Sequence, residues 1–190
     1  MDALFTIPYG EYAVADTLTK KIEHISVFIP SSRQEKGIDL LLYRFDGAAN
    51  HYSTIQVKQS RTYYQNKLIQ VDSEKIAICG YLWFNRFEIP PNADWIILTG
   101  TRVVHPEKWE EAGISDIYYK PIMLAFTKEE AVKFMGDVKQ RTNPQKDDKM
   151  FGFCYNENGD IFQTRGCPQN RRMSAFLLGN RIREIEESLK

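Results

Sequence analysis

The sequence predicts an α/β fold in which a mixed β-sheet core is flanked by helices and followed by a C-terminal hairpin and helix. Three observations lead to this prediction. A segment with apolar residues at helical spacing opens the chain, at least four strand-like segments follow it, and a turn between apolar runs precedes a last amphipathic segment. With 190 residues and 43% hydrophobic side chains, the chain is long enough to bury its own core.

The first part of the chain predicts one helix and three strands. In residues 9–24, Ala15, Leu18 and Ile22 recur at helical spacing. Residues 25–29 are β-branched and aromatic, which is typical of a strand. Residues 38–45, IDLLLYRF, form a near-continuous apolar run that fits a strand covered on both faces. Residues 53–60, STIQVKQS, alternate between apolar and polar side chains, so one face is expected to pack and the other to stay polar.

The second part of the chain predicts further strands and a helix. Residues 61–72 form a mixed segment without a clear period, and an aromatic stretch follows it. The runs DWIILTGTRVV and PIMLAF are strand candidates. Residues 128–141 are expected to be helical, with Ala131, Phe134, Met135 and Val138 facing inward.

The clearest boundary in the chain is TNPQKDDK, residues 142–149, which is polar and without periodicity. It divides the sequence into a predicted core at residues 1–141, a loop or linker at 142–149, and a C-terminal piece at 150–190 that packs on the core. The C-terminal piece should contain a hairpin around Asn158 and Gly159 and a helix from Arg171 onward with Leu178, Ile182 and Ile185 on one face.

Charge and cysteine content narrow the functional classes. The chain has 25 basic and 25 acidic side chains, so no global field draws it to nucleic acid or to an anionic membrane, and phosphate binding must come from local patches. Three scattered cysteines fit neither a disulfide framework nor a zinc site, which favours a reduced, cytoplasmic setting. The sequence has neither a signal-peptide pattern nor a long apolar run, so no membrane association is expected.

Four polar residues are placed where polar side chains are costly. Asp39 lies in an apolar strand, where a carboxylate must be paired, hydrogen-bonded or bound to a metal. Gln56 and Lys58 share the polar face of the next predicted strand. Glu11 lies on the predicted inner face of the first helix, together with Ala15, Leu18 and Ile22. If the two strands form a hairpin, these four groups converge on one spot.

These residues resemble a known pattern: GEYAVADTL on a first helix, KGIDLLLY on a strand and STIQVKQS on the next strand. This is similar to the PD-(D/E)XK nuclease superfamily, in the QxK variant of the Mrr-like restriction endonucleases. The resemblance spans roughly residues 10–60, with a looser match at DWIILTG. It implies a restriction-endonuclease-like fold and a metal-dependent DNA endonuclease of restriction, repair or mobile-element type.

The resemblance also implies a role for each residue. Asp39 would ligate Mg²⁺, for which Mn²⁺ could substitute, Lys58 would polarise or position the attacking water, and Glu11 would complete the surroundings of the ion. Gln56 departs from the family, because its carbonyl can coordinate but adds no charge, which lowers metal affinity. Many such nucleases cut both DNA strands by pairing two subunits, so a homodimer is among the expectations.

Other interpretations of these residues stay open. Taken singly, Asp39 could cap a strand end, Glu11 could lie at an exposed helix start, and Lys58 could extend from an edge strand. Arg171 and Arg172 belong to a C-terminal arginine group that could contact DNA phosphates or form a solvated face. The alternative function is a non-catalytic module that binds nucleic acid or protein and retains the nuclease fold, since function resides in the site rather than in the fold.

Overall fold

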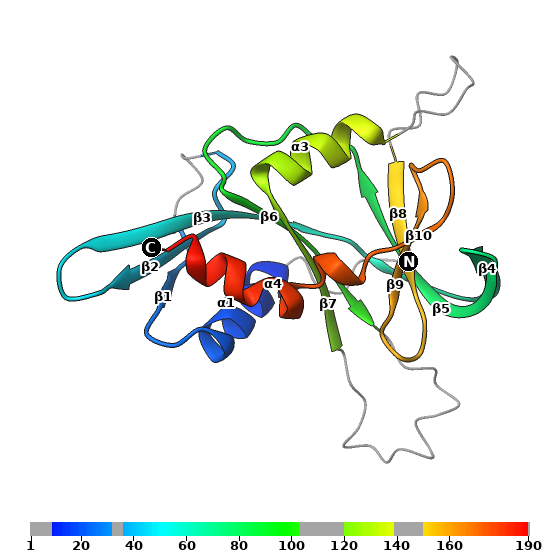
Figure 1. Cartoon of the computed structure of the whole chain (residues 1–190), viewed down its shortest axis with the longest axis horizontal. Helices are drawn as coiled ribbons and strands as arrows, with labels where there is room; N and C mark the ends of the chain where they lie inside the picture. Colours follow the sequence, from blue (N-terminus) through cyan, green and yellow to red (C-terminus); the bar gives the residue numbers. More distant parts are fainter. Residues whose placement is uncertain (1–8, 32–35, 103–119, 139–149, 190) are drawn as a thin grey trace, which may run out of the picture.

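The computed structural model describes residues 9–31, 36–102, 120–138 and 150–189. Two five-stranded β-sheets and three α-helices make up this part of the chain (Figure 1). The α/β prediction is therefore confirmed. The predicted linker at 142–149 lies outside the described residues. None of the helices in the described ranges has the length and apolar character needed to cross a membrane.

The first sheet is mixed, with strand order β1-β2-β3-β6-β7. β3 pairs in parallel with β6, and every other pair in this sheet is antiparallel. The connection from β2 to β3 is a hairpin, as expected. The strands of this sheet are β1 (Ser26–Phe28), β2 (Leu40–Phe45), β3 (Asn50–Gln59), β6 (Trp95–Arg102) and β7 (Lys120–Thr127).

Helices cover the first sheet on both faces. α1 (Tyr9–Lys21) and α4 (Leu178–Glu187) pack on one face, where Val14 and Ile185 join a core with Ile55 and Val57 of β3. α3 (Lys128–Asp137) packs on the other face with β6 and the second sheet. The short 3₁₀ helix η3 (Ser174–Phe176) precedes α4. The two faces of β6 therefore meet different cores, since Ile96 and Leu98 join one and Trp95 and Ile97 join the other.

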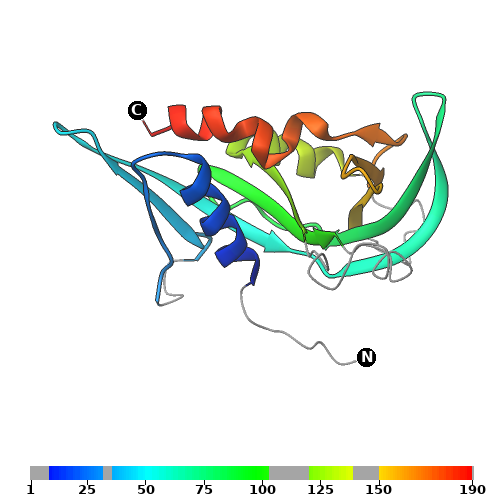
Figure 2. The ribbon, with the colours of Figure 1, turned by 90° about the horizontal axis from the view of Figure 1, so that it is seen from below.

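The second sheet is antiparallel and has the order β10-β9-β8-β5-β4. Figure 2 shows its β4–β5 hairpin bending back on itself. The end of this hairpin meets the segment before β10: Asn170 Nδ2 donates to Gln70 O (2.9 Å), and Arg172 pairs with Glu74 (2.5 Å). The strands are β4 (Thr62–Val71), β5 (Glu74–Asn85), β8 (Met150–Tyr155), β9 (Ile161–Arg165) and β10 (Arg171–Arg172).

Two local predictions are wrong for physical reasons, and the structure accounts for one segment without a clear period. That mixed segment, at 61–72, is the edge strand β4, which has mostly exposed side chains and a bulge between Tyr64 and Lys67. The last helix begins at Leu178, and Arg171 lies in the edge strand β10 instead. β2 is not covered on both faces, since Leu40 and Leu42 are buried and Phe45 is 58% exposed.

Candidate active site

Asp39 immediately precedes β2 and is bonded to β3 twice. Its backbone N–H donates to Ile55 O (2.9 Å), and its carboxylate Oδ2 accepts from the backbone N–H of Val57 (2.7 Å). The pairing of β2 with β3 ends at Leu40 and Ile55. The carboxylate thus takes the place of a backbone acceptor where the β2–β3 ladder stops. Its Oδ2 is held at Val57, the residue between Gln56 and Lys58.

Gln56 and Lys58 belong to the same face of the first sheet. Ile55 and Val57 pack in the core beneath α1, so the alternating residues Gln56 and Lys58 project to the opposite face. The hydrogen bond from Val57 N–H holds the Asp39 carboxylate at the backbone between these two residues. β2, which Asp39 precedes, and β3 are adjacent in a mixed sheet, as the sequence predicts.

Two chain segments meet above Thr54, the neighbour of Gln56 on the same face of β3. Thr54 Oγ1 on β3 donates to Asn92 O (2.7 Å), and Asn92 Nδ2 donates to Lys36 O (3.1 Å). Residues 90–92 therefore extend from β3 to the segment that precedes Asp39. Gly37 makes this contact with φ +93°, and a Cβ there would lie 2.4 Å from Pro90 Cβ, so only glycine fits.

The side-chain oxygen of Gln56 has no hydrogen-bond partner among the described residues. Gln56 is 6% exposed, and within the described ranges its Oε1 is buried and accepts no hydrogen bond. A buried acceptor without a donor is destabilising by about 1–3 kcal/mol. A cation or an ordered water beside Asp39 would satisfy it.

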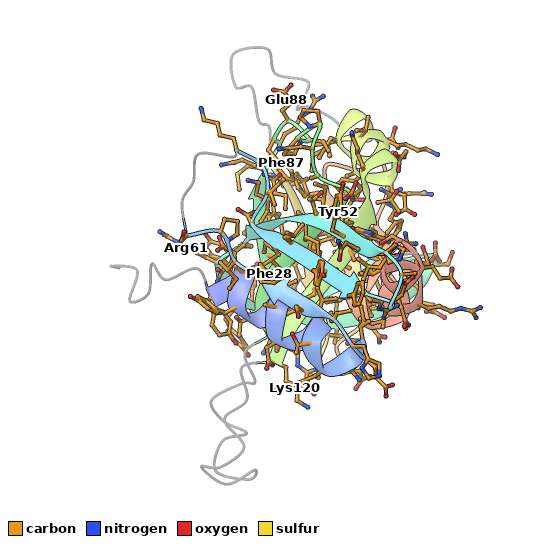
Figure 3. All side chains as sticks on the ribbon, turned by 90° about the vertical axis from the view of Figure 1, so that its left-hand side faces the viewer. Phe28, Tyr52, Arg61, Phe87, Glu88 and Lys120 are labelled. Atoms are coloured by element: carbon orange, nitrogen blue, oxygen red, sulfur yellow. The ribbon has the colours of Figure 1, made fainter. Side chains whose placement is uncertain are left out.

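Lys58 is partly buried and contacts an aromatic ring. Its Nζ lies 5.4 Å from the centroid of Phe87, which follows β5. A cation at this distance over a ring face is attracted by the ring quadrupole. Figure 3 shows Phe87 beside α3, on the same side of the first sheet. The ammonium group is thus held on the face that carries Gln56.

Glu11 approaches from the other face. It lies in the first turn of α1, and the backbone N–H of Gly10 donates to Gln59 Oε1 (3.0 Å). This bond places the start of α1 at the C-terminal end of β3, where the described part of β3 beyond Ile55 has β6 as its only strand neighbour. The inner stripe of α1 consists of Gly10, Val14 and Leu18, which leaves Glu11 at its border.

The structure therefore places Gln56 and Lys58 on one face, holds the Asp39 carboxylate at the backbone between them, and places Glu11 at the open edge of the same strand. Arg171 and Arg172 lie in the second sheet and are engaged there. Arg171 Nε donates to Gln163 Oε1 (2.7 Å), and Arg172 pairs with Glu74. Their role in DNA binding stays a prediction.

Sequence reasoning missed two features of the site. The first is the contact of residues 90–92 with Gly37, for which the Pro90–Pro91 pair gave only a turn signal. The second is Phe87 beneath the Lys58 ammonium, a ring that the sequence shows only as part of an aromatic stretch. Both join segments about 30 to 50 residues apart, which no local period reveals.

The donor set suits a hard cation with few protein ligands. The Asp39 carboxylate and the Gln56 carbonyl are oxygen donors, which Mg²⁺ prefers, and this ion commonly keeps several waters and uses one or two carboxylates. The described residues contain no group of three His, Cys, Asp or Glu side chains that could hold a metal ion. The residues therefore fit a site completed by water and substrate rather than a closed protein cage.

Comparisons of the chain with profiles of protein families, with curated proteins and with solved structures find no match.

Proposed function

We propose that the chain is a metal-dependent DNA endonuclease with a PD-(D/E)XK-type, restriction-endonuclease-like core. The observation that carries this proposal is the buried Oε1 of Gln56, which has no partner among the described residues and lies on the same sheet face as Lys58, next to the Val57 N–H that binds Asp39. A bound cation would satisfy this acceptor. The adjacency of β2 and β3 and the resemblance of GIDLLLY and QVK to the family pattern support the same proposal.

Each side chain has a distinct role in this proposal. Asp39 and Gln56 would hold Mg²⁺ or Mn²⁺, which acidifies bound water and neutralises charge at the phosphate. The Lys58 ammonium would polarise or position the attacking water, while Phe87 limits where the ammonium can lie. Val57 N–H holds Asp39 Oδ2, so the cation would be bound through the other carboxylate oxygen. Glu11 would complete the surroundings of the ion from across the edge of β3.

Plasmid cleavage tests the proposal. Purified protein is incubated with supercoiled DNA in Mg²⁺, in Mn²⁺ and in chelator, and nicked and linear products are quantified. We expect cleavage in both metals and none in chelator. Lys58→Ala should lower the rate by roughly 10²–10⁴-fold, the usual contribution of a positioned proton-transfer group, while the fold is retained.

The matched control is Lys75→Ala, which removes an exposed lysine from β5 outside the site. It should leave the cleavage rate unchanged. A folded Lys58→Ala variant that cleaves like wild type would contradict the proposed role of this lysine.

The position of Glu11 favours a second candidate, a non-catalytic module that binds nucleic acid or protein. Its helix packs on the face opposite Gln56, which would leave Asp39 as the single one of the two carboxylates available to a cation there. Under this alternative, the protein binds DNA in chelator and in Mg²⁺ alike and releases no cleaved product in either metal.

A further inference from the structure

A groove of about 560 Å³ lies between the segment after β5 and α3. Its volume is in the range of small-ligand sites. Apolar side chains form most of its wall, and the exposed side chains of Arg86 and Glu88 stand at its border. Figure 3 shows Phe87 and Glu88 next to α3. The residues lining the groove are Arg86, Phe87, Glu88, Ile89, Val132, Met135 and Gly136.

Phe87 connects this groove to the candidate active site. Its side chain lines the groove, and the same ring lies 5.4 Å from Lys58 Nζ. A ligand group that contacts the Lys58 ammonium is therefore separated from the groove by the Phe87 ring. An anion at Lys58 joined to a flat, apolar ring system in the groove matches the chemistry of one nucleotide, with its phosphate at the ammonium and its base against Phe87.

We propose that the groove binds an unpaired nucleobase of a DNA strand whose phosphate lies at Lys58. This inference rests on the proposed function and names its substrate class: DNA with a single-stranded or extruded nucleotide. Phe87 offers an aromatic surface, and Val132 and Met135 offer apolar contacts. A base within a paired duplex cannot enter such a groove, so it must be unstacked first.

The polar residues at the border complement a base edge. Arg86 presents donors and Glu88 presents acceptors, which can bond to ring carbonyls and exocyclic amino groups. The exposed Val132, at 55%, leaves apolar surface in contact with water until a ligand covers it. The groove has apolar walls and carries one positive and one negative side chain at its border. This combination distinguishes it from a site for phosphate alone.

Gly136 allows the groove to be closed without a clash. A Cβ built at Gly136 meets no heavy atom within 4 Å, so a larger side chain points into open space. Gly136→Phe should fill the groove, and Gly136→Ala should leave it open. Gly179 in α4 is a matched control, because it is also helical and also open within 4 Å.

The test measures binding by fluorescence anisotropy in chelator, so that no cleavage is needed. Three labelled duplexes are compared: one with a single unpaired nucleotide, the same with that nucleotide abasic, and one fully paired. We expect wild type to bind the unpaired nucleotide about tenfold more tightly than the other two, the order of one stacked base. Gly136→Phe should lose this preference and keep its affinity for the paired duplex, whereas Gly136→Ala and Gly179→Phe should keep both.

Two outcomes overturn the inference: equal binding of the three duplexes by wild type, or a preference that survives in Gly136→Phe. The first is also the result expected if the groove takes an apolar peptide. Plasmid cleavage without a base preference refutes the groove assignment alone. A Gly136-dependent preference without plasmid cleavage refutes the endonuclease proposal and leaves the groove assignment standing.

Discussion

Replacing Gln56 by glutamate puts a second carboxyl group into a buried position near Asp39. Gln56 is 6% exposed and its Oε1 has no donor in the described ranges, so the introduced group is desolvated and faces a like charge. Both effects raise the pKa of the introduced carboxyl above the ordinary value of about 4.3. Without a cation, the folded Gln56→Glu protein should therefore bind this proton more tightly than the unfolded chain does.

The size of the effect follows from linkage. If the introduced carboxyl stays protonated at pH 7 in the folded state, the loss of stability is about 1.36 × (7 − 4.3), or about 3.7 kcal/mol. Because the folded pKa is raised, the loss vanishes below about pH 4 and grows by about 1.4 kcal/mol per pH unit up to the folded pKa. For a chain of this size, 3.7 kcal/mol lowers the Tm by roughly 7–15 °C.

Thermal melts at several pH values, with chelator and with Mg²⁺, measure this effect. Mg²⁺ should restore more stability to Gln56→Glu than to wild type, because it binds the native state through one more negative oxygen. Gln56→Met is the control, since it keeps the length of the side chain without oxygen or charge; its Tm should show the pH dependence of wild type and no Mg²⁺ shift. Equal melting curves for wild type and Gln56→Glu at pH 7, in chelator and in Mg²⁺, would refute the placement of this side chain at a cation site.

Three further predictions follow from the described contacts. Arg181 is 9% exposed and bonded to Glu130 and Glu184, both partly solvated, so Arg181→Met should lower the unfolding free energy by about 2–3 kcal/mol in urea titrations; a loss below about 1 kcal/mol would contradict a stabilising pair. Burial raises the pKa of Cys154 to about 12. A thiol reagent at pH 8 should therefore leave Cys154 unmodified in the native protein and label it in denaturant. Rapid labelling of the native protein would show that the core around Cys154 opens. Replacing Arg171 with alanine should reduce the salt slope of DNA binding by about 0.9 if it contacts a phosphate, and an unchanged slope would assign it to its bond with Gln163 alone.

The alternation of side chains along a strand predicts which residues of the site share a face. The alternation in STIQVKQS places Gln56 and Lys58 on one face, and the short turn after β2 makes the two strands neighbours, both of which the structure has. The α/β class follows from the same periodic signals.

The remaining features depend on contacts that carry no local signal. The stripe of α1 is centred on Val14 rather than on Ala15, which moves Glu11 to its border. β4 is an exposed edge with a bulge, so its alternation is lost, and the contact above Thr54 depends on Gly37 meeting Pro90 in space. Such long-range contacts are decided by tertiary packing rather than by residue pattern.

The second sheet is assembled from strands that are synthesised at different times. The β4–β5 hairpin emerges from the ribosome well before residues 150–172, yet its apolar residues Val71 and Ile78 belong to a small core that includes Cys154 and Phe162. Until that later segment arrives, the edge of β5 that pairs with β8 at residues 80–85 and the apolar face of the hairpin have no native cover. During translation, this exposed apolar surface therefore persists until residues 150–165 have been made and β8 and β9 can pair beside β5.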